Sequence, residues 1–213
     1  MQVTNCGNIN LIREVFLRSN RLWVFSECLE IKLLTMKFSN TRLGGCYVIN
    51  TDVHCDLRGR FTKCYNEAEF IKKGINFTLK EQFFTISHKN VLRCMHFQLP
   101  PHGHCKLVSC FSGAILDVLL DLRKDSSTYG KSESLELTAN DGKTLFIPEG
   151  IAHGFLSLQD NSGLLYNTSA EYAPDHDIGI RWDSFEYNWP VKKPIISIRD
   201  DNQPLFYEIE SPF

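Results

Sequence analysis

The sequence predicts a mainly β protein in which antiparallel strands form a sandwich or barrel, with only a few short helices. From Met36 onward, short runs of β-branched and aromatic residues are separated by Gly, Asn, Asp and Pro, which is typical of closely spaced strands. Strands do not alternate with long helical segments, so a parallel α/β sheet is not expected. The chain has 213 residues, 43% of them hydrophobic, which is enough to bury a real core.

Five runs along the chain after Met36 are examples of the expected strands. In order, they are residues 44–53, 104–111, 114–123, 143–150 and 163–172. One segment in this part favours a helix, the sequence NEAEFIKK at residues 66–73. The close spacing of the runs, without an internal repeat, favours a sandwich or barrel.

Residues 1–35 differ from the rest and are predicted to be an N-terminal extension of unknown role, before a single domain at residues 36–213. They show no turn chemistry, and residues 11–34 have apolar positions that suit an amphipathic helix. We expect Met36 to be the functional start, or the extension to be dispensable. The alternative is a helix that packs on the barrel or on a second subunit.

Composition excludes several classes of function. Lys and Arg number 23 against 25 Asp and Glu, a net charge of −2, so a general nucleic-acid or membrane-surface role is not expected. No apolar run approaches the ~18–20 residues of a membrane-spanning helix. The eight cysteines form no CxxC pair, and the N-terminus lacks the features of a secretory signal. These features predict a cytoplasmic protein whose cysteines are mostly reduced core thiols.

One motif makes the fold prediction more specific. Residues 142–157 read GKTLFIPEGIAHGFLS, a glycine, five residues and then P-x-G-x-x-H. This pattern resembles the second motif of cupin β-barrels, in which a strand and a tight turn aim a histidine, here His153, into the barrel. The expected fold is therefore a cupin-type double-stranded β-helix, or jelly roll. Its interior is the expected ligand cavity.

The first cupin motif supplies metal ligands through H-x-H and a following glutamate. His102 and His104 have the H-x-H spacing, but Val108 stands where the glutamate belongs and Lys106 lies close by. Without the carboxylate, and with a lysine nearby, we expect neither a metal nor another cofactor. A metal-dependent cupin enzyme is the disfavoured alternative.

From Met36 onward the chain resembles dTDP-4-dehydrorhamnose 3,5-epimerases and related nucleotide-sugar epimerases. The resemblance rests on six fragments in the right order: MKFSNTRLGGCYVINTDVHCDLRGRF, VLRCMHFQLPPHGHCKLVSCFSGAILDVLLDLRKDSSTYG, IPEGIAHGFLSLQD, YNTSAEYAPDHD, IRWDSFEYNWP and ISIRDD. It implies a metal-free jelly roll and a homodimer with exchanged N-terminal strands. The implied reaction inverts C3, C5 or both of a nucleotide-diphosphate 4-keto-6-deoxyhexose through an enolate, in deoxysugar biosynthesis.

The resemblance also implies a set of catalytic residues. His96 in LRCMH matches the base, Asp200 in ISIRD the carboxylate that steadies it, and Tyr166 in YNTSAEY the proton donor. Lys106 matches a lysine near the substrate carbonyl. Epimerisation beside a ketone requires these roles, a base, an acid on the other face and a group that stabilises the enolate. Asp201 adjoins Asp200 and is the alternative partner of the base.

A second set is implied to bind the substrate: Arg58, Arg93, His153, Tyr172, Asp177 and Arg199. Arg58 and Arg93 match arginines that hold the sugar diphosphate, a task suited to the planar two-pronged guanidinium. Tyr172 matches a tyrosine that stacks on the nucleotide base.

Three departures from the family pattern lie near the expected nucleotide site or next to the expected catalytic base. Lys63 replaces a glutamate, Phe83 removes an amide that could bond a base edge, and Cys94 replaces a glycine. Stacking accepts any base, whereas hydrogen bonds choose among bases, so we expect a weak or displaced preference for thymine. The alternative function is a non-catalytic cupin module that binds a sugar or nucleotide sugar. Retention of all four catalytic matches argues against it.

Overall fold

The computed structural model describes residues 35–213. The expectations for the N-terminal extension, including a helix at residues 11–34, fall outside the described residues and stay predictions. The first element, β1 (Met36–Asn40), begins where the family-like sequence begins.

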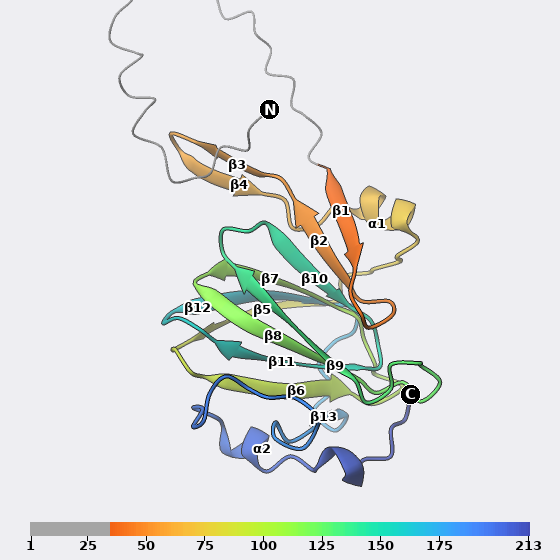
Figure 1. The fold of residues 1–213 in the computed structure, drawn as a ribbon. Coiled ribbons are helices and arrows are strands. Elements are labelled where there is room, and N and C mark those ends of the chain that lie inside the picture. The colour runs from red at the N-terminus through yellow and green to blue at the C-terminus, as the bar shows by residue number, and fades with distance from the viewer. Residues whose placement is uncertain (1–34) are drawn as a thin grey trace, which may run out of the picture.

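Two antiparallel sheets face each other as a sandwich (Figure 1). One sheet has the order β1, β2 (Tyr47–Thr51), β10 (Lys143–Ile147), β7 (Lys106–Ser112), β12 (Ser162–Thr168) and β5 (Glu81–Ser87). The other has the order β13 (Asp177–Gly179), β6 (Leu92–Gln98), β11 (Ile151–Ser157), β8 (Ala114–Asp121) and β9 (Ser132–Thr138). Most spatial neighbours are distant in sequence, as in a jelly roll. The predicted mainly β, cupin-type fold is confirmed.

The remaining elements are short. Within the described residues, strands β3 (Val53–Asp56) and β4 (Gly59–Thr62) pair only with each other and form a hairpin that projects from the sandwich (Figure 1). The predicted helix is present as α1 (Glu67–Lys73). The Asn66 side chain accepts the Glu69 N–H at its start, and Gly74 at φ 83° ends it, because a left-handed residue there favours glycine. Near the C-terminus lie α2 (Ile198–Asp201) and the 3-10 turn η3 (Phe206–Glu208).

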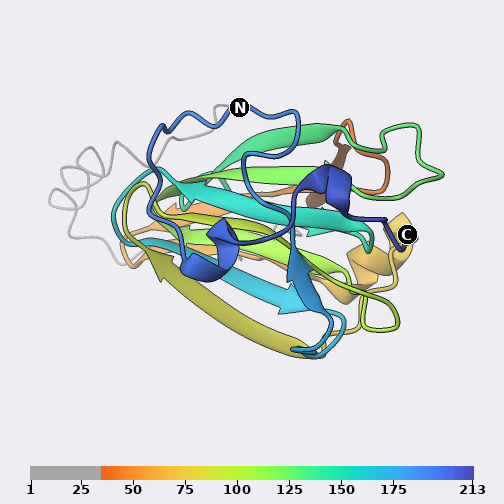
Figure 2. The ribbon, with the colours of Figure 1, turned by 90° about the horizontal axis from the view of Figure 1, so that it is seen from below.

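Apolar side chains fill three layers. Val108, Leu119 and Leu164 belong to the core between the sheets. The outer face of the five-stranded sheet is covered by the C-terminal segment from residue 180 to 213 (Figure 2), and the outer face of the six-stranded sheet packs against Phe70 of α1. Both faces of β8 are therefore buried, which explains its nearly continuous apolar sequence, AILDVLLD.

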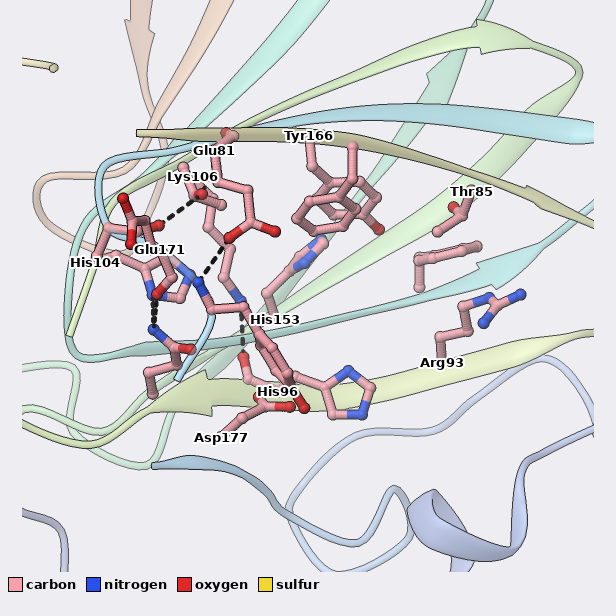
Figure 3. Close-up of a pocket in the computed structure, with 16 residues that line it drawn as sticks. Glu81, Thr85, Arg93, His96, His104, Lys106, His153, Tyr166, Glu171 and Asp177 are labelled. Carbon is pink, nitrogen blue, oxygen red and sulfur yellow. Dashed lines mark hydrogen bonds between the residues drawn. The ribbon is translucent and has the colours of Figure 1, made fainter. Parts of the chain in front are cut away.

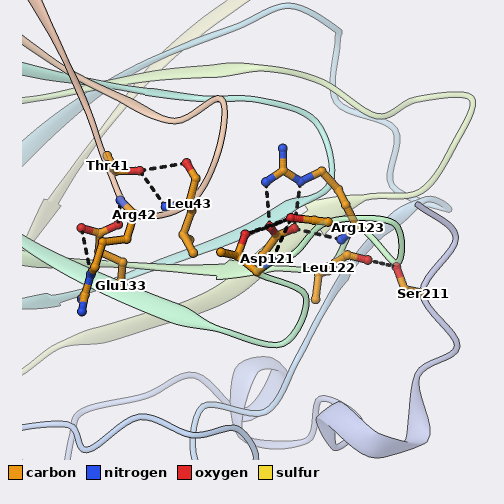
Figure 4. Close-up of polar contacts among 10 residues, drawn as sticks. Thr41, Arg42, Leu43, Asp121, Leu122, Arg123, Glu133 and Ser211 are labelled. Atoms are coloured by element: carbon orange, nitrogen blue, oxygen red, sulfur yellow. Dashed lines mark hydrogen bonds and ion pairs between the residues drawn. The ribbon is translucent and has the colours of Figure 1, made fainter.

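A buried carboxylate closes the turn between β8 and β9 (Figure 4). Asp121 is fully buried and accepts hydrogen bonds from Arg123 Nε at 2.8 Å and Nη2 at 2.7 Å, and from the hydroxyls of Ser126 and Thr128. Burial opposes its ionisation, but these donors outweigh burial and lower the pKa of Asp121 to about 2. The turn is thus held in one shape at the end of the sandwich.

Two further contacts tie distant segments to this end (Figure 4). The Ser211 hydroxyl donates to the carbonyl of Leu122, which fastens the C-terminal tail. The Arg42 N–H donates to Glu133 Oε2 at 2.7 Å, which fastens the turn after β1 to β9. Both contacts hold loops against the sandwich where β8 ends and β9 begins.

The described helices and cysteines bear on two sequence predictions, one about membrane spans and one about thiols. Within residues 35–213, none of the helices has the length and apolar character needed to cross a membrane. Cys46, Cys64, Cys94, Cys105 and Cys110 are free thiols, and three of them are buried. Burial raises the pKa of the Cys46, Cys94 and Cys110 thiols, so these three act as small core side chains.

Candidate active site

The two sheets enclose a cavity of about 230 Å³. Its walls come from β5, β7 and β12 of one sheet and from β6 and β11 of the other (Figure 3). Seven of the ten residues predicted for the site line it: His96, Lys106, Tyr166, Arg93, His153, Tyr172 and Asp177. The predicted site is therefore largely brought together inside the jelly roll.

His96 is bound to a buried carboxylate behind the cavity wall. Its Nε2 lies 2.8 Å from Asp200 Oδ1, and the second oxygen of Asp200 accepts the Cys94 N–H at 3.4 Å. Burial by itself raises the pKa of Asp200, but the hydrogen bond and charge of His96 outweigh it and hold that pKa below its usual value. Asp200 is buried and Asp201 is exposed, so the first of the two aspartates is the partner. An ionised Asp200 accepts the Nε2 proton and leaves Nδ1 of His96 with the free lone pair.

A β-bulge brings Arg93 and His96 to the same cavity, although they are three residues apart. His153 on β11 pairs with His96 on β6, and the next pairing is Phe155 with Arg93. The step between the two pairings is therefore two residues on β11 and three residues on β6. The extra residue reverses the alternation of side chains, so both residues face inward. Opposite the bulge, a Cβ on Gly154 would lie 2.4 Å from the Cβ of Cys94. Glycine is therefore required on β11 at this point.

Lys106 places a buried cation in the cavity. It is only 8% exposed, and its Nζ donates to the backbone oxygen of His96 at 2.9 Å. Burial lowers the pKa of Lys106 to about 8, while the charges of Asp177 and Asp117 oppose the shift. In most of the molecules, Lys106 is therefore protonated and positively charged at neutral pH. An ammonium has three N–H donors, so Lys106 can bond a ligand oxygen as well as the backbone.

His153 is fixed by a second buried carboxylate, Asp117. The His153 Nε2 lies 2.8 Å from Asp117 Oδ2, and both side chains are buried. Burial raises the pKa of Asp117, and the charges of His153 and Lys106 oppose this only in part. The other oxygen, Oδ1, has no hydrogen-bond partner among the described residues. His153 pairs with His96 across β11 and β6, so two histidines, each bound to its own aspartate, lie side by side.

Tyr166 enters from the opposite sheet (Figure 3). Its side chain is buried, with one ring face stacked on Phe83 at a centroid distance of 4.8 Å and an interplanar angle of 10°. The His153 ring meets it edge-on at 5.9 Å. Burial raises the pKa of Tyr166 strongly, and the charge of Asp117 raises it further. The phenol therefore keeps its proton and can act as a donor.

Tyr172 lies at the mouth of the cavity and is 57% exposed. Its backbone N–H donates to Glu81 Oε2 at 2.6 Å. The residues on either side are held by Gln98, whose Oε1 accepts the Ala173 N–H at 2.7 Å and whose Nε2 donates to the Glu171 carbonyl at 3.2 Å. An exposed ring on a fixed backbone is suited to stacking against a planar ligand.

Comparison with known proteins identifies the family. A family model described as dTDP-4-dehydrorhamnose 3,5-epimerase matches residues 40–208. The chain belongs to the dTDP-4-dehydrorhamnose 3,5-epimerase family. It is therefore a sugar epimerase, an isomerase of deoxysugar biosynthesis, which confirms the function and enzyme class predicted from the sequence.

Individual epimerases support this membership. A dTDP-4-dehydrorhamnose 3,5-epimerase of Methanothermobacter thermautotrophicus is 39% identical over 176 residues, which cover 79% of this chain and 94% of the relative. A dTDP-4-dehydrorhamnose 3,5-epimerase from Bacillus anthracis, crystallised with TDP and PPi, is 32% identical with a TM-score of 0.78, covering 81% of this chain and 100% of that one. ChmJ, a 3'-monoepimerase from Streptomyces bikiniensis in complex with dTDP-quinovose, is 29% identical with a TM-score of 0.75, covering 78% and 86% of the two chains.

Three residues predicted for the epimerase site lie outside the cavity wall. Asp200 lies behind His96, and Arg199 donates to the Asp177 carboxylate at 2.6 Å from just outside the wall. Arg58 is different, because it lies at the turn of the β3–β4 hairpin, with its side chain 90% exposed and bound to Asp56. Within one chain, the structure does not bring Arg58 to the cavity.

The histidines of the H-x-H segment take separate positions. His104 lines the cavity, with its Nδ1 at 3.1 Å from the Gln98 amide nitrogen, while the His102 ring lies against His176 at 4.3 Å. Val108 is fully buried in the core. Burial, assisted by Lys106, lowers the pKa of His104 to about 4, so His104 is neutral at physiological pH. Residues 35–213 contain no group of three or more His, Cys, Asp or Glu side chains arranged to hold a metal ion.

Sequence reasoning missed two polar residues that position groups of the epimerase site. Asp117, which holds His153, carried a usable signal, because a carboxylate inside the apolar run AILDVLLD must find a partner once it is buried. Gln98 carried none, because its role depends on a loop more than 70 residues away in sequence. Phe83, expected near the nucleotide base, lies on the cavity wall with its ring on Tyr166.

Proposed function

We propose that this enzyme inverts C3, C5 or both of a dTDP-linked 4-keto-6-deoxyhexose, with His96 as the base and Tyr166 as the acid. One observation carries the proposal: the two residues project into one cavity from opposite sheets, His96 from β6 and Tyr166 from β12. A sugar ring between them meets a proton acceptor on one face and a proton donor on the other. Inversion by a separate base and acid needs this arrangement.

His96 would take the proton next to the C4 ketone. Asp200 accepts the Nε2 proton, so Nδ1 is the ring nitrogen that is free to accept a proton. Abstraction turns the imidazole into a cation, and the ionised, buried Asp200 stabilises that cation. His96 retains partial solvent access, with its side chain 28% exposed, so it can release the proton to water.

Lys106 would stabilise the enolate that forms after abstraction. The negative charge collects on the C4 oxygen, and a desolvated ammonium interacts with that charge more strongly than an exposed one. The bond from Lys106 to the His96 backbone places this cation next to the base. The His153–Asp117 pair adds a polar wall beside the same atoms.

Tyr166 would then protonate the enolate from the far face. Its raised pKa keeps the phenol protonated before the reaction. Transfer of the proton to carbon collapses the enolate to the ketone with inverted configuration, and leaves a phenolate that must regain a proton from solvent. The reaction can repeat at the second carbon beside the ketone without a redox step.

The nucleotide would lie toward the mouth of the cavity. Arg93 lines the cavity beside the bulge and would hold the diphosphate, while the exposed ring of Tyr172 would stack on the base. Asp177, held by Arg199, would bond the sugar or ribose hydroxyls. The expected weak preference for thymine stays a prediction.

We also propose that the epimerase is a homodimer and that Arg58 binds substrate in the cavity of the partner subunit. Arg58 sits on a hairpin that projects from its own sandwich (Figure 1) and pairs with no other strand of residues 35–213. In the same part of the chain, strand β5 is an edge of the six-stranded sheet and exposes Phe84 and Ile86. Exposed apolar edges of this kind favour association with another chain. The cytoplasmic location predicted from the sequence stays a prediction.

The pKa of Lys106 predicts a pH dependence. The lysine is charged below about pH 8 and loses its charge as the pH rises through that value. Because the charged form is the one that stabilises the enolate, kcat should fall on the alkaline side by about tenfold per pH unit once the lysine is mostly neutral. Steady-state kcat between pH 6 and 10, with circular dichroism at each pH, would show the decline. A flat profile to pH 10 in the folded enzyme would contradict the assignment, and Lys106→Met should lack the descending limb.

One experiment tests the proposed function as a whole. The enzyme is incubated with dTDP-4-keto-6-deoxyglucose in deuterium oxide, and the sugar is followed by proton NMR. We expect loss of the proton signals at C3, C5 or both, together with new signals of the inverted product. A module that only binds the nucleotide sugar would leave every carbon-bound proton in place.

A further inference from the structure

We propose that Phe83 fixes the orientation of the Tyr166 ring and thereby determines how the enzyme divides its reaction between C3 and C5. The inference rests on the proposed role of Tyr166 as the proton donor. It concerns a residue at which this chain differs from the pattern of its family.

The two rings are partners in the sheet. Phe83 on β5 and Tyr166 on β12 stand directly opposite each other in the antiparallel register, so their side chains point to the same face, toward the cavity. The rings stack at 4.8 Å with only 10° between their planes. His153 meets the Tyr166 ring edge-on at 64°. With a parallel neighbour on one side and an edge-on neighbour on the other, the phenol ring is held in one plane.

The core between the sheets does not account for this stack. Phe83 is absent from the core clusters and remains 42% exposed, although it lines the cavity. The next residue, Phe84, points to the other face of β5 and meets Phe111 edge-on at 6.2 Å. Among residues 35–213, β5 is an edge strand of its sheet, and β12 is its neighbour there. The Phe83 ring is thus held against the cavity by its stack on Tyr166.

Ring orientation matters because the two reacting carbons lie on either side of C4. Proton transfer requires donor and acceptor atoms about 3–3.5 Å apart and well aligned. A hydroxyl held at one place cannot meet this condition equally for C3 and C5, so a small rotation of the phenol changes which carbon receives its proton faster. The family contains enzymes that differ in this respect, because ChmJ is a 3'-monoepimerase.

Phe83→Leu tests the inference, since it removes the ring and keeps an apolar side chain. The matched control is Phe206→Leu, the same change at a half-buried ring that packs on Tyr129 outside the five-stranded sheet, away from the cavity and from strand β5. Each protein is given dTDP-4-keto-6-deoxyglucose in deuterium oxide, and the rates at which inverted product forms at C3 and at C5 are measured by NMR. Phe83→Leu should change the ratio of the two rates by about threefold to tenfold, the factor to which a typical aromatic pair energy corresponds.

The controls make the outcome decisive. Phe206→Leu should keep the original ratio, and Phe83→Tyr should keep it too, because the stacking ring is retained. Phe83→Met is the second test variant if the leucine protein does not fold. An unchanged ratio in a folded variant without the ring, or an equal change in Phe206→Leu, would overturn the inference alone. Absence of exchange by the unmodified enzyme would overturn the proposed function and this inference with it.

Discussion

His96→Ala should lower the rate of solvent deuterium incorporation into the 4-keto sugar by about 10²–10⁴-fold, the usual contribution of a positioned general base. Two other histidines line the cavity, His104 and His153. The Nδ1 of His104 lies 3.1 Å from the Gln98 amide nitrogen, and the Nε2 of His153 is bound to the buried Asp117. His96 differs from His153 in its partial exposure and in its ionised partner, Asp200. The measurement is proton NMR of the substrate in deuterium oxide at matched enzyme concentrations.

Asp200→Asn is the companion variant for this prediction. It keeps the size of the side chain and removes the charge that stabilises the His96 cation, so exchange should slow by less than in His96→Ala. The backbone N–H of residue 200 can still donate to the Ser197 hydroxyl, and the remaining side-chain oxygen can still accept the Cys94 N–H. These two bonds keep α2 in place. Near-normal exchange in a well-folded His96→Ala protein would show that another residue is the base.

Tyr166→Phe should separate proton removal from inversion. The variant keeps the ring that stacks on Phe83 and loses only the hydroxyl, so the fold and the position of His96 should be unchanged. Formation of inverted product should fall by about 10²–10⁴-fold, as expected for loss of a general acid. Exchange at the carbon that is deprotonated first should fall less, because His96 can return a solvent-derived deuteron to the face from which it took the proton.

Chiral analysis of the product and NMR exchange rates on the same samples measure the two effects separately. If inversion and exchange decrease equally, Tyr166 is not the specific proton donor. The Phe83→Leu variant provides a useful contrast, since it keeps the hydroxyl and changes only what holds it. The two variants therefore distinguish the chemical role of the phenol from the role of its orientation.

Local sequence patterns were enough to predict the short helix and the runs that cover all or most of β2, β7, β8, β10 and β12, but not β5, β6 and β9. Runs such as 143–150 become strands because both faces are covered by apolar layers, and α1 begins and ends at residues with clear capping chemistry. The P-x-G-x-x-H pattern placed His153 inside the barrel, as the structure has it. Such features depend on residues that are close together in the sequence.

The parts that sequence reasoning missed depend on contacts between distant segments. Simple alternation along β6 would send Arg93 and His96 to opposite faces, and only the bulge beside Gly154 brings both into the cavity. The hydrogen bonds from Gln98 to the loop that carries Tyr172 arise from the packing of two segments that no local pattern relates. Prediction from a single sequence therefore named the proposed base, its carboxylate partner and the proposed acid, and missed the groups that hold His153 and the Tyr172 loop.

The central claim is that a base and an acid act from opposite walls of one cavity. It is tested most directly by a single turnover in deuterium oxide, with enzyme already equilibrated in that solvent and in excess over protonated dTDP-4-keto-6-deoxyglucose. A separate acid, Tyr166, enters the reaction as O–D, so each inverted carbon of the product should carry deuterium from the first turnover. If the inverted carbons instead retain a substantial fraction of the original hydrogen, a single group carries the proton between the faces, and the account is wrong.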